Sequence, residues 1–187
     1  MRTEAGIAAL EGYQAPSRGA VAQARASAIR MLGQRLRLAV VQATELKTQI
    51  EARARAGFSP LMRLKGVNAL SAGMLAALLG PGQRFPTDAD LALYAGVAPL
   101  EVSSAGRVRH RVNRGGNRRL NAILYRIALT QARVWPDAQA YVARRMGEGK
   151  TKREAIRALK RYLVRAIWRL WKECVPQTSG RVAAHAA

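Results

Sequence analysis

Apolar residues recur every three or four positions over a long stretch in the first third of the chain. Between residues 21 and 56 there is one glycine and no proline. Seven apolar residues keep the helical spacing: Ile29, Leu32, Leu36, Val40, Ala43, Leu46 and Ile50. The pattern predicts one long amphipathic helix or a broken pair. Because a small domain cannot cover one face of so long a helix, we expect it to pack against another chain or domain, with an intramolecular bundle as the alternative.

Two short apolar segments follow, on either side of Lys65-Gly66-Val67-Asn68. Their pattern fits a helix-hairpin-helix, in which a glycine-containing turn brings backbone amides up to a DNA phosphate. Lys65, Gly66 and Asn68 are therefore candidate nucleic-acid-binding residues. Asn68 stands where the second glycine is usual, and because Asn tolerates a left-handed conformation better than most residues, the turn can still form. A plain pair of antiparallel helices fits the same pattern.

The remainder of the chain is predicted to contain four helices, the first from Thr87 to about Ala95, and one extended segment. Thr87 with Asp90 and Thr151 with Glu154 are capping-box pairs that predict helix starts. Valines alternate with polar residues over residues 99–116, which predicts a short β-hairpin or an extended basic loop. Helices are expected over residues 117–134, 137–146 and 151–175. The expected core positions of the first and last of these are Leu120, Ile123, Leu124, Ile127, Leu129, Ile156, Leu159, Leu163, Ile167, Leu170 and Cys174.

The predicted fold class is thus mainly α, with a long coiled-coil-like helix followed by a compact helical domain. We expect a flexible lead-in over residues 1–20, the long helix over 21–57, the compact domain over 58–175 and a disordered tail over 176–187. The lone Cys174 and the two histidines do not make a usual zinc set, so no metal is expected in this chain. With no apolar run long enough to span a bilayer, we expect a cytoplasmic protein with no membrane partner.

Charge indicates a polyanionic partner. The sequence has 32 Lys and Arg against 11 Asp and Glu, which gives a formal net charge of +21. Between Val102 and Pro136 there are eight arginines and no acidic residue. The last helix carries an arginine every four residues with no acids alternating along that face, which favours an anionic ligand over a merely solvated face. The candidate nucleic-acid-binding residues here are Arg107, Arg109, Arg111, Arg114, Asn117, Arg118, Arg119, Arg153, Arg157, Arg161 and Arg165.

The order and spacing of four sequence blocks resemble a known family. They are LKGVNALSAGMLAALLG, RFPTDADLALYAGVAP, SSAGRVRHRVNRGGNRRLNAILYRIA and the closing amphipathic helix. Together, from Leu61 to about Val175, they resemble the C-terminal transposase domain of IS110/IS116/IS902-type insertion-sequence transposases. The long helix is similar to the coiled-coil arm of that family. The family pattern is found here as Phe85, Tyr94 with Gly96 and Pro99, Ser104, the stretch Arg107–Arg114, and Gly116-Asn117-Arg118-Arg119-Leu120.

The resemblance implies a catalytic role for a serine. Ser104 would attack a DNA phosphodiester and hold the strand covalently, while a separate RuvC-like domain would supply Mg²⁺ through an acidic tetrad and a guide RNA would select the sites. Ala105 stands where the family has glycine after the serine, so Ser103 is the alternative nucleophile. The glutamates of the first sixty residues, Glu4, Glu11, Glu45 and Glu51, are not arranged as metal ligands.

The resemblance leaves two functions open. The first is DNA binding and strand transfer in transposition, as the C-terminal half of a recombinase that has little activity without the RuvC-like domain. The second is a non-catalytic DNA- or RNA-binding remnant. Charge and pI, apart from the resemblance, suggest a third, an RNA-binding protein of ribosomal character, although the sequence has no RNA-stacking aromatic motif. DNA, a guide RNA, and a second copy or a RuvC-like domain held through the long helix are the expected partners, and association with the nucleoid is the expected location.

Overall fold

The computed structural model describes residues 4–80, 84–104, 107–113 and 115–174, with the description of residues 100–112 limited to the backbone. The predicted disordered tail and Arg114 lie outside the described residues. The chain divides into two compact units, residues 1–49 and residues 50–187. Each unit is described by itself.

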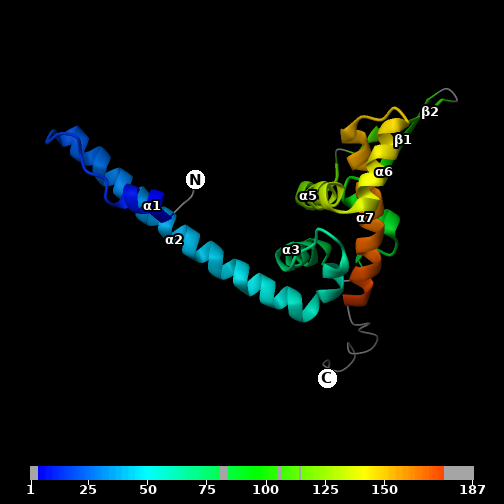
Figure 1. Cartoon of the computed structure of the whole chain (residues 1–187), viewed down its shortest axis with the longest axis horizontal. Helices are drawn as coiled ribbons and strands as arrows, with labels where there is room; N and C mark the ends of the chain where they lie inside the picture. The colour runs from blue at the N-terminus through cyan, green and yellow to red at the C-terminus, as the bar shows by residue number, and fades with distance from the viewer. Residues whose placement is uncertain (1–3, 81–83, 105–106, 114, 175–187) are drawn as a thin grey trace, which may run out of the picture. The chain divides into compact units, whose positions relative to one another are not determined.

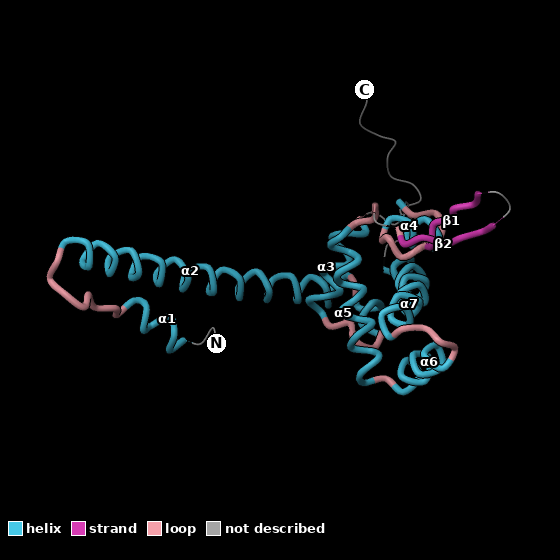
Figure 2. The backbone as a smooth tube through the Cα atoms, turned by 90° about the horizontal axis from the view of Figure 1, so that it is seen from above, coloured by secondary structure: helices cyan, strands magenta, loops and turns pink. Residues whose placement is uncertain are grey.

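Unit 1 contains a short helix lying against a long one (Figures 1 and 2). Helix α1 spans Glu4–Glu11, and α2 spans Ala20–Gly57, so that its last residues belong to unit 2. Ile7 of α1 and Ala26 of α2 are buried. Gly33 allows the close approach, because a Cβ at this position would lie 3.0 Å from the Glu11 amide nitrogen and from the Leu10 Cβ. The prediction of a flexible lead-in over residues 1–20 was therefore wrong, since eight of these residues form a docked helix.

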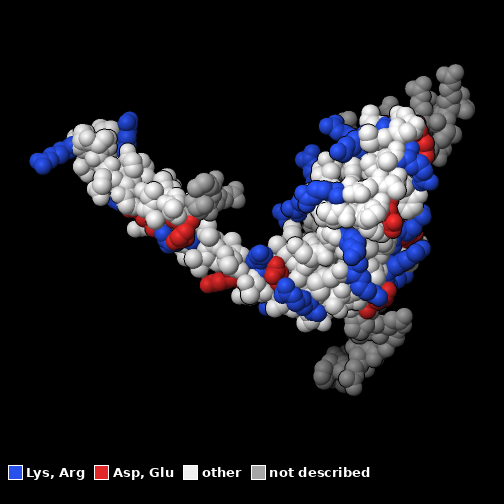
Figure 3. Space-filling model, viewed as in Figure 1, with Lys and Arg blue, Asp and Glu red and all other residues white. Residues whose placement is uncertain are grey.

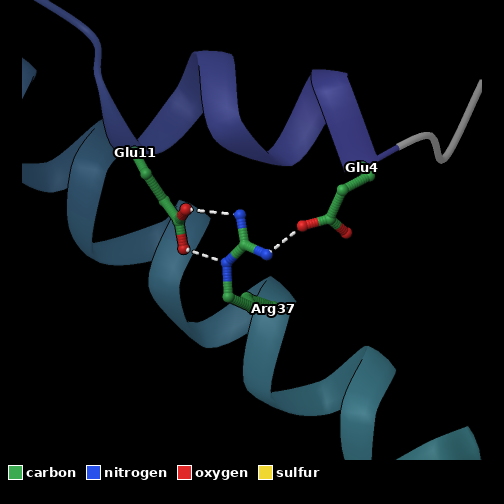
Figure 4. A network of polar contacts seen from close by, with 3 residues as sticks. All are labelled: Glu4, Glu11 and Arg37. Carbon is green, nitrogen blue, oxygen red and sulfur yellow. Dashed lines mark hydrogen bonds and ion pairs between the residues drawn. The ribbon is translucent and has the colours of Figure 1, made fainter.

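One arginine holds both ends of α1 to α2 (Figure 4). Arg37 donates from Nε and Nη2 to the two carboxylate oxygens of Glu11, each at 2.7 Å, and from Nη1 to Glu4. The hydrogen bonds from Arg37 lower the pKa of the Glu11 carboxyl, despite the opposing effect of desolvation. The two-pronged geometry orients α1 more than a single exposed ion pair would. In the sequence these carboxylates are far from Arg37, which is why the contact was not foreseen.

The apolar stripe of the long helix is present but uncovered. Helix α2 is continuous, which resolves the choice between one helix and a broken pair. Within unit 1 its stripe residues Leu32, Leu36, Val40 and Leu46 are exposed, and Leu32 retains 61% of its accessible surface. A stripe of this kind is typical of a surface that meets another protein surface.

Unit 2 is built around the last helix. Its elements after α2 are η1 (Ser59–Arg63), α3 (Ala69–Leu79), α4 (Asp88–Tyr94), β1 (Pro99–Ser104), β2 (Arg107–Val112), α5 (Arg118–Val134), α6 (Pro136–Gly147) and α7 (Lys152–Cys174). Helix α7 packs on η1, α4, α5 and α6. Its buried residues Ile156, Leu159, Leu163 and Ile167 match the predicted apolar stripe, and Trp171 extends the stripe by stacking on Phe58 at 5.4 Å between ring centroids. The mainly α prediction is confirmed.

The predicted helix boundaries follow from local capping. Thr87 and Asp90 form the capping box of α4. Thr151 accepts from the Glu154 amide, and its own amide and hydroxyl donate to the Glu154 carboxylate, which lowers the pKa of that carboxyl. Pro136 ends α5 and begins α6, because proline lacks the amide that would continue α5 but suits a first helical turn. Among the expected core positions, Leu129 is exposed, and Leu170 and Cys174 are only half-buried.

The segment before α3 differs from the predicted helix-hairpin-helix. Its first arm is a 3-10 helix of 5 residues, so only the second arm is an α-helix. Gly66 has the left-handed conformation, with φ of +84°. Asn68, in contrast, is extended, with φ of −99°, and caps α3 by accepting from the Ser71 amide. Asn68 therefore does not use the left-handed conformation that the predicted turn allowed, and its side chain serves as a helix cap instead.

The basic segment is an antiparallel hairpin. Strands β1 and β2 pair from Pro99 opposite Val112 to Ser104 opposite Arg107. This decides between the two predicted forms of residues 99–112, a β-hairpin and an extended loop. The hairpin projects from the helical part of unit 2 (Figures 1 and 2).

Candidate nucleic-acid interface

Two glycines join α4 to α5 at the base of the hairpin. Gly96 has φ of +67°, and a Cβ there would lie 3.2 Å from the Gly116 Cα. A Cβ on Gly116 would lie only 2.3 Å from the Gly96 nitrogen, so the two backbones touch where no side chain fits. This contact explains why the sequence pattern requires a glycine before the hairpin and another after it.

Asn117 and Asn121 fix this joint through hydrogen bonds to α4 and the residues that follow it. Asn117 donates from its amide to the Tyr94 carbonyl and from Nδ2 to the Tyr94 hydroxyl, both at 2.7 Å. Its Oδ1 accepts from the Leu120 amide and caps α5. Asn121 donates from Nδ2 to the Ala95 carbonyl at 2.8 Å. Asn117, which we predicted to bind nucleic acid, thus uses both side-chain polar atoms within the fold.

Lys160 on α7 completes the same joint from the other side. Only 6% of Lys160 is exposed, and its Nζ donates to Asn121 Oδ1 at 2.8 Å. Burial, and to a lesser degree the repulsion from Arg157, lower the pKa of the Lys160 ammonium below that of an ordinary lysine. An ammonium has three donors, and Asn121 takes one of them.

An open cavity of about 640 Å³ lies at the base of the hairpin, and four residues of the joint line it: Gly96, Gly116, Asn121 and Lys160. One part of its lining consists of residues 96–99, which lead into β1, together with Asn113 and Gly116. Its charged side chains are Arg118, Glu154, Arg157, Lys160 and Arg161. Four cationic groups therefore face one carboxylate, and we call this site the cationic cavity. The volume is within the usual range for a ligand pocket, and the charge suits an anion.

The surrounding surface has the same sign. In the view of Figure 3, Lys and Arg side chains lie in patches along the edges of unit 2, and acidic side chains are seen at fewer places. Arg119 and Arg153 are exposed outside the cavity lining, and Arg165 is bound to Asp88 at 2.9 Å. Among the described residues, no helix combines the length and the apolar character needed to cross a membrane.

The hairpin register separates the two candidate serines. In an antiparallel pair, residues opposite one another share a face, and successive residues alternate between faces. Position 104 therefore lies on the same face as positions 107, 109 and 111, all arginines, whereas position 103 shares its face with Val108, His110 and Val112. Ser104 lies five residues along β1 from Pro99, or about 17 Å at the usual rise of a strand.

The structure does not gather all of the predicted residues at one site. Lys65, Gly66 and Asn68 lie near the far end of α5, where Gln131 Nε2 donates to the Lys65 carbonyl at 2.8 Å. Gln131 is 13 residues from Arg118, about 20 Å along the helix. Of the predicted residues whose side chains the structure describes, Arg118, Arg157 and Arg161 line the cationic cavity.

Lys160 and Asn121 were not among the residues predicted from the sequence. The available signal was a lysine at a core position of the last helix, because Lys160 is spaced with Ile156, Leu163 and Ile167 on one face. A charged residue in such a stripe is rarely buried without a partner. Asn121 had no comparable signal.

Comparison with known proteins identifies the domain. Residues 59–143 match the family described as Transposase IS116/IS110/IS902 family. The chain is also 32% identical over 135 residues to an uncharacterized 43.6 kDa protein of insertion element IS110 from Streptomyces coelicolor. The chain carries a transposase domain of the IS116/IS110/IS902 family. The resemblance seen in the sequence is confirmed.

The matched region of this transposase domain covers η1 through most of α6, including the glycine joint and the hairpin. Helix α7, which supplies Lys160, Arg157 and Arg161 to the cationic cavity, follows it. The alignment with the Streptomyces protein covers 71% of this chain and 33% of that protein. The chain thus spans about a third of the length of this relative.

Proposed function

We propose that the chain binds DNA in the transposition of an insertion element and that Ser104 is the nucleophile of strand transfer. The observation that carries the DNA-binding part is the cationic cavity, where Lys160, Arg118, Arg157 and Arg161 line one space at the base of the hairpin. Phosphate groups are the anions that arginine and lysine bind in DNA. The match to a transposase family supports a role in DNA transposition.

A phosphate is a good match for the cavity. Lys160 is held by Asn121, so its ammonium is fixed in position before any ligand arrives. Its buried charge has incomplete compensation, which an anion would supply. Arg118, Arg157 and Arg161 would add donors from two helices, α5 and α7. Such contacts position a DNA strand without reading its sequence.

The pairing register of β1 and β2 favours Ser104 over Ser103 as the nucleophile. Its position faces Arg107 across the hairpin and shares a face with Arg109 and Arg111. Arginines near the reacting phosphate stabilise the negative charge that develops in the transition state. The cavity, about 17 Å away by strand geometry, would hold a different phosphate of the same DNA and orient it.

The reaction is a transesterification. Ser104 Oγ would form a bond to phosphorus, a phosphorus–oxygen bond of the DNA backbone would break, and the Oγ proton would pass to a base. The displaced deoxyribose oxygen would take up a proton and leave a free hydroxyl. In the described part of the chain no group of three or more acidic, His or Cys residues could hold a metal ion. As the family resemblance implies, we propose that a RuvC-like domain supplies the Mg²⁺.

The exposed stripe of α2 supports a proposal about assembly. Leu32, Leu36, Val40 and Leu46 are uncovered within unit 1, and a second copy or the RuvC-like domain would bury them. A guide RNA is a further proposed partner that rests on the family resemblance, as does association with the nucleoid.

A non-catalytic DNA- or RNA-binding remnant is the second candidate. The observation that favours it is the separation of Ser104 from the cavity, because the cavity can bind a phosphate whether or not the serine reacts. Both functions require nucleic-acid binding, so only the covalent step separates them.

The test has a binding stage and a covalent stage. Arg118→Gln and Arg157→Gln should each weaken DNA binding by about tenfold or more and reduce its salt dependence, since each removes a charged contact to phosphate. Arg169→Gln is the matched control, because Arg169 is exposed on α7 outside the cavity. Equal loss in all three variants would contradict a specific role for the cavity.

In the covalent stage, DNA carrying an insertion-element end is mixed with the chain, magnesium and a separately supplied RuvC-like domain. A denaturing gel should show a protein–DNA adduct with the wild type and with Ser103→Ala, and none with Ser104→Ala. The catalytic proposal fails if the adduct survives in Ser104→Ala. It also fails if the wild type forms no adduct under these conditions while still binding DNA, which would leave the non-catalytic function.

A further inference from the structure

Helices α6 and α7 enclose a second cavity, of about 280 Å³, that shares Ala158 and Arg161 with the cationic cavity. Its other lining residues are two tyrosines and three arginines: Tyr141, Arg144, Arg145, Tyr162 and Arg165. We call it the tyrosine cavity. It combines aromatic rings with guanidinium groups, the two kinds of group that hold an unpaired nucleotide.

Of the two tyrosine rings, that of Tyr162 has exposed surface on which another ring could stack. Tyr141 and Tyr162 meet edge to face, with 5.2 Å between centroids and 73° between planes. Tyr141 is half-buried, and the Arg144 guanidinium carbon lies 5.4 Å from its centroid. Tyr162, in contrast, is 55% exposed. The contact with Tyr141 therefore orients Tyr162 and still leaves much of it free to stack on another ring.

The arginines are only partly neutralised. Arg144, at 3.9 Å, and Arg145 both pair with the single carboxylate of Glu148, and Arg165 pairs with Asp88. Within the described part of the chain, Arg161 makes no ion pair, and the buried Nε of Arg145 has no hydrogen-bond partner. The cavity therefore keeps a positive excess, which favours a phosphate beside the rings.

We propose that the tyrosine cavity binds one unpaired nucleotide of a nucleic-acid strand, with the base stacked on Tyr162 and the phosphate beside Arg161 and Arg165. This inference rests on the proposed nucleic-acid binding. The small volume suits a single nucleotide, and a base in a duplex is stacked between its neighbours and has no free face to offer. A ribonucleotide and a deoxyribonucleotide share this chemistry.

The spacing of α7 supports one continuous path through both cavities. Arg157 lines the cationic cavity, Arg161 lines both cavities and Arg165 lines the tyrosine cavity. Residues four apart on a helix rise by about 6 Å and lie on the same face. A strand whose phosphate occupies the cationic cavity would thus pass Arg161 and reach Tyr162 within a short distance.

The test is a double-mutant cycle between the ring and the base. The affinity of the chain for a deoxythymidine strand is compared with that for the same strand carrying abasic sites, for wild type and Tyr162→Leu. We expect the wild type to bind the base-bearing strand about 5- to 150-fold more tightly, the usual effect of stacking one base on an aromatic ring. Tyr162→Leu should lose this preference, and Tyr162→Phe should retain it.

The controls separate this inference from folding and from the proposed function. Tyr13→Leu replaces an exposed tyrosine of unit 1 and should keep the preference. Thermal denaturation checks that Tyr162→Leu is folded, and its affinity for a blunt duplex should match that of the wild type. The same cycle is measured with uridine strands in parallel. The sugar that the cavity prefers is the one whose strand shows the larger coupling energy between the Tyr162 ring and the base.

The inference is overturned if removing the Tyr162 ring and removing the bases change the binding free energy additively, for both the deoxythymidine and the uridine strands. Normal duplex binding in that case would leave the proposed function intact. If the wild type binds neither duplex nor single strands, both proposals fail together.

Discussion

At the scale of single residues, Lys160 is the side chain in which burial and charge conflict most. It is nearly covered, its ammonium is bound to Asn121, and its pKa is lowered mainly by desolvation. Below the folded-state pKa, Lys160 is charged in the folded protein, and its burial then lowers the free energy of unfolding. As the pH rises from the folded-state pKa towards the pKa of an ordinary lysine, this destabilisation is relieved. A group kept under such a cost is often one that a ligand uses.

This conflict predicts a pH-dependent DNA affinity. The contribution of Lys160 should be complete below its folded-state pKa and be lost as the pH rises through that value, which lies below 10.5. Lys160→Arg should retain affinity across the same range, because a guanidinium stays charged. Lys160→Met should bind about tenfold or more weakly at neutral pH and lack the decline.

Fluorescence anisotropy with labelled DNA from pH 7 to pH 10 would measure these three curves. The ratio of wild-type to Lys160→Arg affinity removes the contribution of the other lysines, which titrate in both proteins. A ratio that stays constant over the range would contradict the role of Lys160. The stability should change with pH in the opposite direction to the DNA affinity. As the pH rises, the unfolding free energy of the wild type should increase relative to that of Lys160→Met.

At the scale of elements, the sequence predicted most of the helices but not how they meet. The capping pairs Thr87–Asp90 and Thr151–Glu154 act between neighbouring residues, so local pattern was sufficient. Helix α1 was missed because its docking depends on Arg37, which is distant in sequence. The serine and arginine positions were visible, but their common face required the strand register, and the cationic cavity required α7 to pack beside α5.

The joint between α4 and α5 gives a prediction at this scale. Gly116→Ala would place a Cβ 2.3 Å from the Gly96 nitrogen, a backbone atom that cannot turn aside as a side chain can. We expect a loss of about 2 to 3 kcal/mol in unfolding free energy, the upper range for an overpacked site. Gly147→Ala is the matched control, because nothing lies within 4 Å of its Cβ and the substitution should be neutral or slightly stabilising.

Urea denaturation followed by circular dichroism would measure both variants. Gly116→Ala should also weaken DNA binding, because the joint positions Asn121 and hence Lys160. A variant as stable as Gly147→Ala would contradict the close contact of the two backbones. Thus the glycines of the family pattern are explained by packing between elements and need no direct contact with DNA.

At the scale of the whole molecule, the question is what covers the apolar stripe of α2. Within unit 1, α1 occupies the surface around Gly33 and Arg37, and the stripe from Leu32 to Leu46 remains exposed. Fully burying one leucine side chain stabilises a complex by about 1.5 to 3 kcal/mol, so several such residues suffice for a stable interface. Between the two proposed occupants, only a second copy is present in a solution of the chain alone.

We therefore expect the purified chain to self-associate through α2, and sedimentation velocity should detect a species larger than the monomer. Leu32→Glu with Leu36→Glu should shift it to the monomer, since two charges would be buried in the interface. Gln34→Glu with Gln42→Glu adds the same charge at exposed polar positions of the same helix and should leave the assembly unchanged. A wild-type chain that stays monomeric would exclude self-association and favour a separate domain as the partner of the stripe, because the exposed leucines would still need cover.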